Sequence, residues 1–187
     1  MKSVANSAGS ASTGIVPCNV SVNPTIWERH TDRLDRLQEE CPDIRIGGRG
    51  GGDPAKAVEH KTRDEWGCVW HHPGMYLTGV VVEHPLDTWD KLGKWQPPPV
   101  EARVTAIAQR AEEARQAGRT PPGAGFEHGF LFLRLTYLRG FENFMVDVAE
   151  RNPKLLELRD LVADYWYTVA KAHLDHGGTH VGGGDDL

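Results

Sequence analysis

Two adjacent carboxylates, Asp185 and Asp186, are the residues of this chain best suited to chemistry. They follow glycines and a short β-prone stretch, residues 179–181, so we expect them just beyond the end of a strand. In α/β folds, ligands bind at the carboxyl ends of strands. Asp185 and Asp186 are therefore candidate catalytic residues that polarise or position a substrate. The alternative is a plain turn.

A second group of reactive side chains lies earlier in the chain. Asp64 and Glu65 suit acid–base or cation-binding roles, and Asp64 is a candidate catalytic residue; the alternative is a helix-end or ion pair. Cys68, His71 and His72 are of types that bind zinc. Their spacing is not that of a standard structural zinc site, so no metal ligand is assigned. We expect His71 to line a polar, substrate-binding pocket; the alternative is a hydrogen bond to a backbone carbonyl.

A phenol and a guanidinium, Tyr137 and Arg139, close an expected third strand. This pair suits an anionic substrate, with Tyr137 as a catalytic residue and Arg139 as a substrate-binding one; alternatively, Arg139 pairs with Glu142. Trp66 and three further tryptophans suit the wall of a large planar ligand, which makes Trp66 a candidate substrate-binding residue. The alternative is that they cover the rim of a small core.

Hydrophobic periodicity predicts the elements that must position these residues. Asn-Pro pairs at residues 23–24 and 152–153 are typical helix starts. The glycine run at residues 47–52 predicts a loop; a phosphate site is not favoured, because no Lys-Ser/Thr or GxGxxG pattern fits. The expected strands are residues 15–22, 79–84, 129–137 and 179–183, and the expected helices are residues 24–40, 100–117, 141–150 and 153–176.

This alternation of strands and helices favours a parallel sheet with crossover helices, an α/β fold. Four strands are half of an eight-stranded barrel, so we expect a partial TIM (β/α)8 barrel of about the first four βα units. Residues 1–14 are expected to form a loose segment before a single domain at residues 15–187. The length of 187 residues is short of the roughly 250 that a full barrel needs.

Composition excludes several classes of function. The net charge of −5 with dispersed basic residues argues against a nucleic-acid partner. Three widely spaced cysteines do not form a disulfide framework, which favours a reducing compartment. No secretory signal or apolar run of about 18 residues is seen, so we expect a cytoplasmic protein with no membrane contact.

Several segments, taken in order, resemble the uroporphyrinogen decarboxylase superfamily. They are the IVP and PTIW stretches at residues 15–17 and 24–27, DEWGCVW at residues 64–70, YLRGFENFMVDVAERNP at residues 137–153, and GDDL at residues 184–187. This superfamily includes the decarboxylase of haem synthesis and methyltransferases that use methylcobalamin or methylated corrinoid proteins. The resemblance implies a TIM barrel of which this chain is the N-terminal half.

The resemblance also bears on individual residues. It places a family aspartate that contacts pyrrole NH groups on Asp64, and a family tyrosine on Tyr137. In the decarboxylase branch an arginine motif after the first strand grips substrate carboxylates, whereas residues 19–24 contain no arginine. In the methyltransferase branch a His-x-Cys pair and a later cysteine of the C-terminal half hold zinc. Zinc is therefore expected only with a further C-terminal half, and no cofactor in this chain.

Three functions follow. The first is a fragment of a corrinoid-linked methyltransferase-like enzyme, acting on a methylated corrinoid and partnered by a corrinoid protein. The second is a uroporphyrinogen decarboxylase, acting on a tetrapyrrole. The third is a truncated, non-catalytic chain or a half-barrel that acts only when paired. Because a half-barrel exposes sheet edges and apolar faces, we expect the isolated chain to self-associate.

Overall fold

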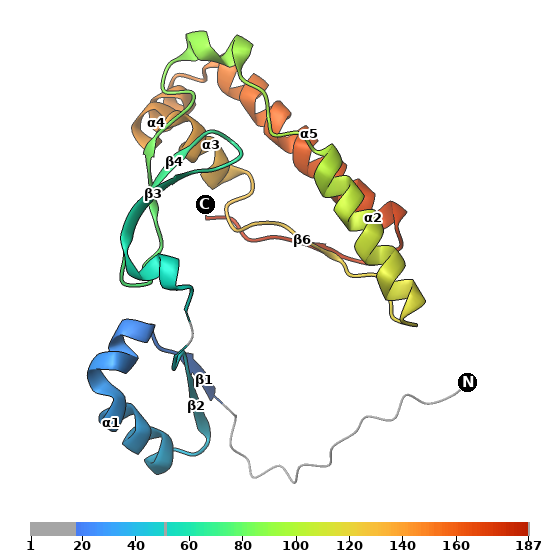
Figure 1. Cartoon of the computed structure of the whole chain (residues 1–187). Helices are drawn as coiled ribbons and strands as arrows, with labels where there is room; N and C mark the ends of the chain where they lie inside the picture. Colours follow the sequence, from blue (N-terminus) through green and yellow to red (C-terminus); the bar gives the residue numbers. More distant parts are fainter. Residues whose placement is uncertain (1–17, 51, 187) are drawn as a thin grey trace. The chain divides into compact units, whose positions relative to one another are not determined.

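The computed structural model describes residues 18–50 and 52–186. The chain divides into two compact units, Met1–His60 with His72–Thr78 and Lys61–His71 with Gly79–Leu187. The expected loose segment at residues 1–14 and the first part of the expected opening strand, residues 15–17, lie outside the described residues. Figure 1 shows the elements of both units, and each unit is described by itself below.

The first unit contains a strand–helix–strand motif (Figure 1). Strands β1 (Cys18–Ser21) and β2 (Ile44–Gly47) pair in parallel, and helix α1 (Pro24–Glu40) connects them. The side chain of Asn23 caps α1 by accepting a hydrogen bond from the Thr25 amide at 2.8 Å. The Asn-Pro helix start is thus confirmed, whereas β2, the parallel partner of β1, is a strand that was not predicted.

Gly47 ends β2, and the described residues of the glycine run that follow it, Gly48 to Gly50 and Gly52, lie in a loop, as predicted. Gly48 has a φ of +102°, and a Cβ built there would lie 2.0 Å from the Val22 carbonyl oxygen. Only glycine fits this position without a backbone shift. A short 3-10 helix, η1 (Pro54–Ala57), follows the loop.

A three-stranded sheet of order β3-β4-β5 carries the tryptophan-rich segment. Its strands are β3 (Glu59–Arg63), β4 (Val69–Pro73) and β5 (Val80–Glu83). Strands β4 and β5 are antiparallel, with an irregularity between Val69 and Trp70. The predicted strand around residues 79–84 is therefore present, but the expectation that it joins the other predicted strands in one parallel sheet is wrong, because it pairs antiparallel in a separate sheet. A 3-10 helix, η2 (Trp89–Lys94), comes after it.

The second unit is dominated by helices. Those at residues 100–117, 141–150 and 153–176 were predicted and appear as α2 (Glu101–Gln116), α4 (Phe141–Ala149) and α5 (Pro153–Asp175). Asn152 caps α5 by accepting a hydrogen bond from the Lys154 amide at 3.0 Å. Helices α2 and α5 pack side by side (Figure 1).

The predicted strand at residues 129–137 is wrong: the segment contains helix α3 (Phe132–Arg139). Apolar residues occupy both parities of this segment, since Phe130 and Phe132 alternate with Leu131 and Leu133, so the segment has no true period of two. The strand instead lies earlier, at β6 (Ala124–Gly125).

The last strand, β7 (Val181–Gly182), is confirmed, although it is shorter than expected. It pairs in parallel with β6, with Ala124 opposite Val181 and Gly125 opposite Gly182. Helices α3, α4 and α5 form the connection between these two strands. The second unit therefore contains a strand–helices–strand motif of its own.

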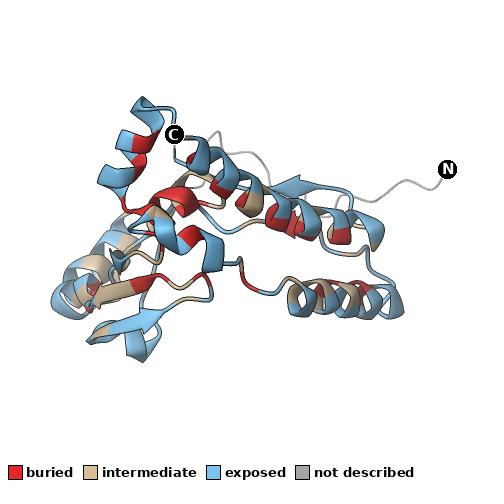
Figure 2. Cartoon of the chain, turned by 90° about the horizontal axis from the view of Figure 1, so that it is seen from above, coloured by how far each residue is buried: buried red, intermediate tan, exposed pale blue. Residues whose placement is uncertain are grey.

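The main core belongs to the second unit and joins the inner faces of its helices to the tryptophan-rich segment. Figure 2 colours the buried residues red. Fully buried side chains at its centre are Cys68, Leu86, Leu138, Leu158 and Val162. The chain is thus mixed α/β, and none of the described sheets closes into a barrel. No described helix combines the length and apolar character needed to cross a bilayer.

Candidate functional site

The parallel ribbon of β6 and β7 places two loops side by side at the carboxyl ends of the strands. Backbone hydrogen bonds extend the pairing beyond both strands: the Phe126 amide donates to the Gly182 carbonyl and the Gly129 amide to the Gly184 carbonyl, each at 2.8 Å. The loop after β6 carries Glu127 and His128, and the loop after β7 carries Asp185 and Asp186. We call the groups at these two loop ends the strand-end site.

Asp185 has a structural role at the start of α3. One carboxylate oxygen accepts hydrogen bonds from the amides of Leu131 and Phe132 at 2.9 and 2.6 Å, and the other accepts from the Leu133 amide at 3.1 Å. These are amides at the start of α3, which have no partner within the helix. Asp185 therefore caps α3 from a distant part of the chain and locks the β7 loop onto that helix.

Asp186 remains available. Its side chain is 70% exposed, and its carboxylate oxygen Oδ1 lies 3.4 Å from Nε2 of His128, itself 66% exposed. The adjacent Asp185 and Asp186 therefore have different roles: one carboxylate holds a helix, and the other faces solvent beside an imidazole. Only Asp186 of the two is free to meet a substrate.

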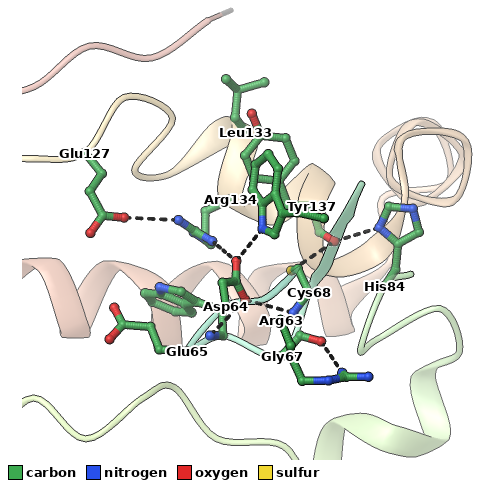
Figure 3. Close-up of polar contacts among 12 residues, drawn as sticks. Arg63, Asp64, Glu65, Gly67, Cys68, His84, Glu127, Leu133, Arg134 and Tyr137 are labelled. Atoms are coloured by element: carbon green, nitrogen blue, oxygen red, sulfur yellow. Dashed lines mark hydrogen bonds and ion pairs between the residues drawn. The ribbon is translucent and has the colours of Figure 1, made fainter. Parts of the chain in front are cut away.

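Asp64 lies at the centre of a polar cluster (Figure 3). Its Oδ1 accepts from the amides of Trp66 and Cys68 at 3.0 and 2.8 Å, and its Oδ2 accepts from the Trp70 indole at 2.9 Å and the Arg134 guanidinium at 3.2 Å. Both oxygens are engaged, so the arrangement uses Asp64 to fix the turn after β3 and to orient Arg134.

Arg134 is a buried cation shared by two carboxylates. Figure 3 shows it between Asp64 and Glu127, and its second terminal nitrogen donates to Glu127 at 3.3 Å. Arg103 donates to the other oxygen of Glu127 at 2.9 Å and to Glu65 at the same distance. The guanidinium of Arg134 also lies 4.9 Å from the ring centroid of Trp66. The charges around these arginines are thus paired within the chain.

Tyr137 lies on α3 beside this cluster, and its ring packs edge-on against Trp70 at 5.0 Å between centroids. Its hydroxyl makes no hydrogen bond to any residue that the structure describes. Burial raises the pKa of Tyr137; the nearby Arg134 opposes this rise, and Asp185 and Asp186 add to it. Tyr137 therefore offers a neutral phenol near the strand-end site.

Cys68 is buried beneath the same cluster. Its thiol donates to the Tyr137 carbonyl oxygen at 3.4 Å. Burial, reinforced by the negative charge of Asp64, raises the pKa of Cys68 to about 12. A thiol in this state is a poor nucleophile and a poor metal ligand, because both roles need the thiolate.

Arg139 is buried and paired within the chain. It donates through Nε to Asp147 at 2.8 Å, with both side chains 5% exposed, and through Nη1 to the Leu86 carbonyl oxygen. The expected alternative partner was Glu142, but the structure pairs Arg139 with Asp147. Trp89 completes the cluster, with its indole donating to Asp147 at 2.9 Å.

The other two predicted substrate-binding residues are part of the framework. Trp66 is 2% exposed and stacks with Trp95 and Trp166 in the core. His71 is half-buried in β4, opposite Val80 of β5. Among residues 18–50 and 52–186, no three His, Cys, Asp or Glu side chains gather as a metal site would require.

Sequence reasoning missed the charged residues that organise the site. Arg103, Glu127 and Arg134 form its ion-pair network, and His128 contacts Asp186. The signal for Glu127 and His128 was their place just after a strand, but that strand is only two residues long and was assigned to a later segment. Comparisons of the chain with protein-family models, with curated proteins and with solved structures gave no match.

Proposed function

We propose that this chain is the N-terminal part of an enzyme of the uroporphyrinogen decarboxylase superfamily, with its substrate at the strand-end site. The observation that carries the proposal is the parallel pairing of β6 and β7, with chemically active side chains at both carboxyl ends. Substrates of (β/α)8 barrels bind at this end of the strands. The two strand–helix–strand motifs, one in each unit, support the finer assignment to part of such a barrel.

Within the superfamily, the methyltransferase-like branch is favoured. Decarboxylation of a tetrapyrrole with several carboxylates calls for cations that are free to bind them. Residues 19–24 supply none, and Asn23 is occupied by capping α1 and by donating to the Met75 carbonyl oxygen. Arg103 and Arg134 in the second unit are already paired with carboxylates. A substrate without many negative charges fits these surroundings better.

Uroporphyrinogen decarboxylation is the second candidate. It is favoured by the neutral Tyr137 hydroxyl, which has no partner among the described residues and lies near Asp186. A phenol can donate a hydrogen bond to a substrate carboxylate, and Asp186 can accept one from a pyrrole NH.

The test begins with the DNA that follows the codon of Leu187. A reading frame that continues with His-x-Cys and a later cysteine supports the methyltransferase-like enzyme. A continued barrel without these ligands supports the decarboxylase. A stop codon at this point would refute both and leave the third possibility, a half-barrel that acts when paired.

The protein encoded by the whole reading frame is then assayed for two reactions. We expect it to transfer the methyl group of methylcobalamin to a thiol. The change in the cobalamin absorption spectrum measures this transfer. Release of CO2 from uroporphyrinogen, without methyl transfer, would move the assignment to the second candidate. Inactivity with both substrates in a folded, zinc-loaded protein would count against the superfamily assignment.

A further inference from the structure

His128 belongs to none of the sequence motifs, yet the fold places it at the centre of the strand-end site. It is the second residue of the pair Glu127–His128 that follows β6. The next residue, Gly129, donates its amide to the Gly184 carbonyl oxygen at 2.8 Å. The backbone on either side of the two loops is therefore fixed at the point where His128 faces Asp186.

The imidazole ring contacts Asp186 and lies close to Gly184. Its Nε2 lies 3.4 Å from Oδ1 of Asp186. A Cβ built at Gly184 would lie 3.4 Å from Cδ2 of the ring, so the glycine leaves room beside the imidazole. Nδ1 is the ring nitrogen with no partner among the described residues.

The carboxylate determines which nitrogen carries the proton. A carboxylate can only accept a hydrogen bond, so a neutral His128 next to Asp186 places its proton on Nε2. Nδ1 then carries the lone pair and can accept a proton from a substrate. An aspartate that fixes the tautomer of a histidine and stabilises its charged form serves the same purpose in hydrolases with a Ser-His-Asp triad.

We propose that His128 is the proton-transfer group of the strand-end site and that Asp186 is its positioning residue. In the forward step, Nδ1 takes the proton of the acceptor thiol and the S–H electron pair stays on sulfur. The product is a thiolate together with an imidazolium whose positive charge faces Asp186. The proton then passes from the imidazolium to solvent, to which the ring is exposed. The assignment of the thiol rests on the proposed function; the assignment of the His128–Asp186 pair does not.

Other charges near the ring do not compete for this role. Glu127 is held by Arg103 and Arg134 at 2.9 and 3.3 Å. Asp185 is held by the three amides at the start of α3. Asp186 is therefore the carboxylate that stabilises the positive charge of a protonated His128.

The first experiment needs no substrate. Long-range ¹H–¹⁵N spectra of the 187-residue chain report the tautomer of His128, whose signals are assigned by their loss in His128→Gln. We expect the Nε2–H form in the neutral ring, and a larger share of the Nδ1–H form in Asp186→Asn, because the carboxylate that favours the Nε2 proton is then gone. The control variant Asp164→Asn, at an exposed position on α5, leaves the tautomer unchanged. A predominant Nδ1–H form, or an unaltered tautomer in Asp186→Asn, would overturn the pair.

The second experiment measures turnover of the protein encoded by the whole reading frame. His128→Gln should lower kcat by roughly 10²–10⁴-fold with little change in KM, as for loss of a general base. Asp186→Asn should give a smaller loss and an altered pH profile, and the exposed-helix variant Asp164→Asn none. Full activity in His128→Gln would refute the catalytic role. An inactive wild-type protein with the Nε2–H tautomer would refute the proposed function but support the pair.

Discussion

The buried pair of Arg139 and Asp147 should make a large contribution to stability, and the variant Asp147→Asn isolates its charge. Both side chains are 5% exposed and their hydrogen bond is 2.8 Å long. Asparagine keeps an oxygen that can still accept from Trp89 and Asn152, which donate to Asp147 at 2.9 and 3.0 Å. It leaves Arg139 without a counter-charge, since the Leu86 carbonyl and the Trp89 ring supply only partial compensation.

Removing one partner of a buried ion pair costs about 3–5 kcal/mol. Total free energies of unfolding are about 5–15 kcal/mol, so Asp147→Asn should unfold at a much lower urea concentration. Urea titration followed by circular dichroism measures this difference. The matched control is Asp175→Asn, which removes one partner of the exposed Lys171–Asp175 pair and should change stability little.

A second variant separates the charge from the packing. The double change Arg139→Met with Asp147→Leu removes both charges at once and should be less destabilising than Asp147→Asn alone, although Trp89 and Asn152 lose an acceptor. A loss of under about 1 kcal/mol in Asp147→Asn would show that the pair is open to water, contrary to the burial argued above.

Three further outcomes are expected. Asp185→Ala removes the cap of α3 and should lower the free energy of unfolding by about 0.5–2 kcal/mol in urea titrations, with Asp185→Asn losing less. Folding raises the pKa of Cys68 from 9.0 to about 12. The stability that this thiol contributes is therefore complete below pH 9 and is lost as the pH rises towards 12. Cys68→Ala should remove this part of the loss of stability at alkaline pH. In the enzyme encoded by the whole reading frame, Tyr137→Phe should leave the unfolding transition in place and lower turnover, whereas Asp64→Asn should shift the unfolding transition. A stability loss in Tyr137→Phe equal to that in Asp64→Asn would contradict the division of roles between them.

Local signals in the sequence were enough to predict most helices. Asn23 and Asn152 each precede a proline, and each caps its helix with a side-chain oxygen two residues from the amide it binds. This geometry depends on adjacent residues only, so the sequence shows it directly. The helix starts at residues 24 and 153 followed from it.

The helix α3 was missed because its cap is not local. Asp185, which binds the amides at residues 131–133, is more than 50 positions away in the sequence. No pattern near residue 131 reveals it. The strand β6 was missed for a related reason: two residues are too few to show a period, and its pairing with β7 is a long-range contact.

The candidate site was predictable in position but not in role. Asp64, Tyr137, Asp185 and Asp186 do lie in the second unit around the ends of β3, α3 and β7. Which of them is occupied depends on partners that folding brings together, such as Arg134 with Asp64. Residue type alone cannot distinguish a carboxylate that holds the framework from one that meets a substrate.

This division of roles follows from the physical demands on such a site. A reacting group must be held in place, and the groups that hold it must have their own hydrogen bonds satisfied. The carboxylate oxygens of Asp185 bind the amides at the start of α3, and Asp185 thereby fixes the loop that carries Asp186. The adjacent aspartates therefore act as a unit in which the first gives the second a defined position, and His128 meets only the second.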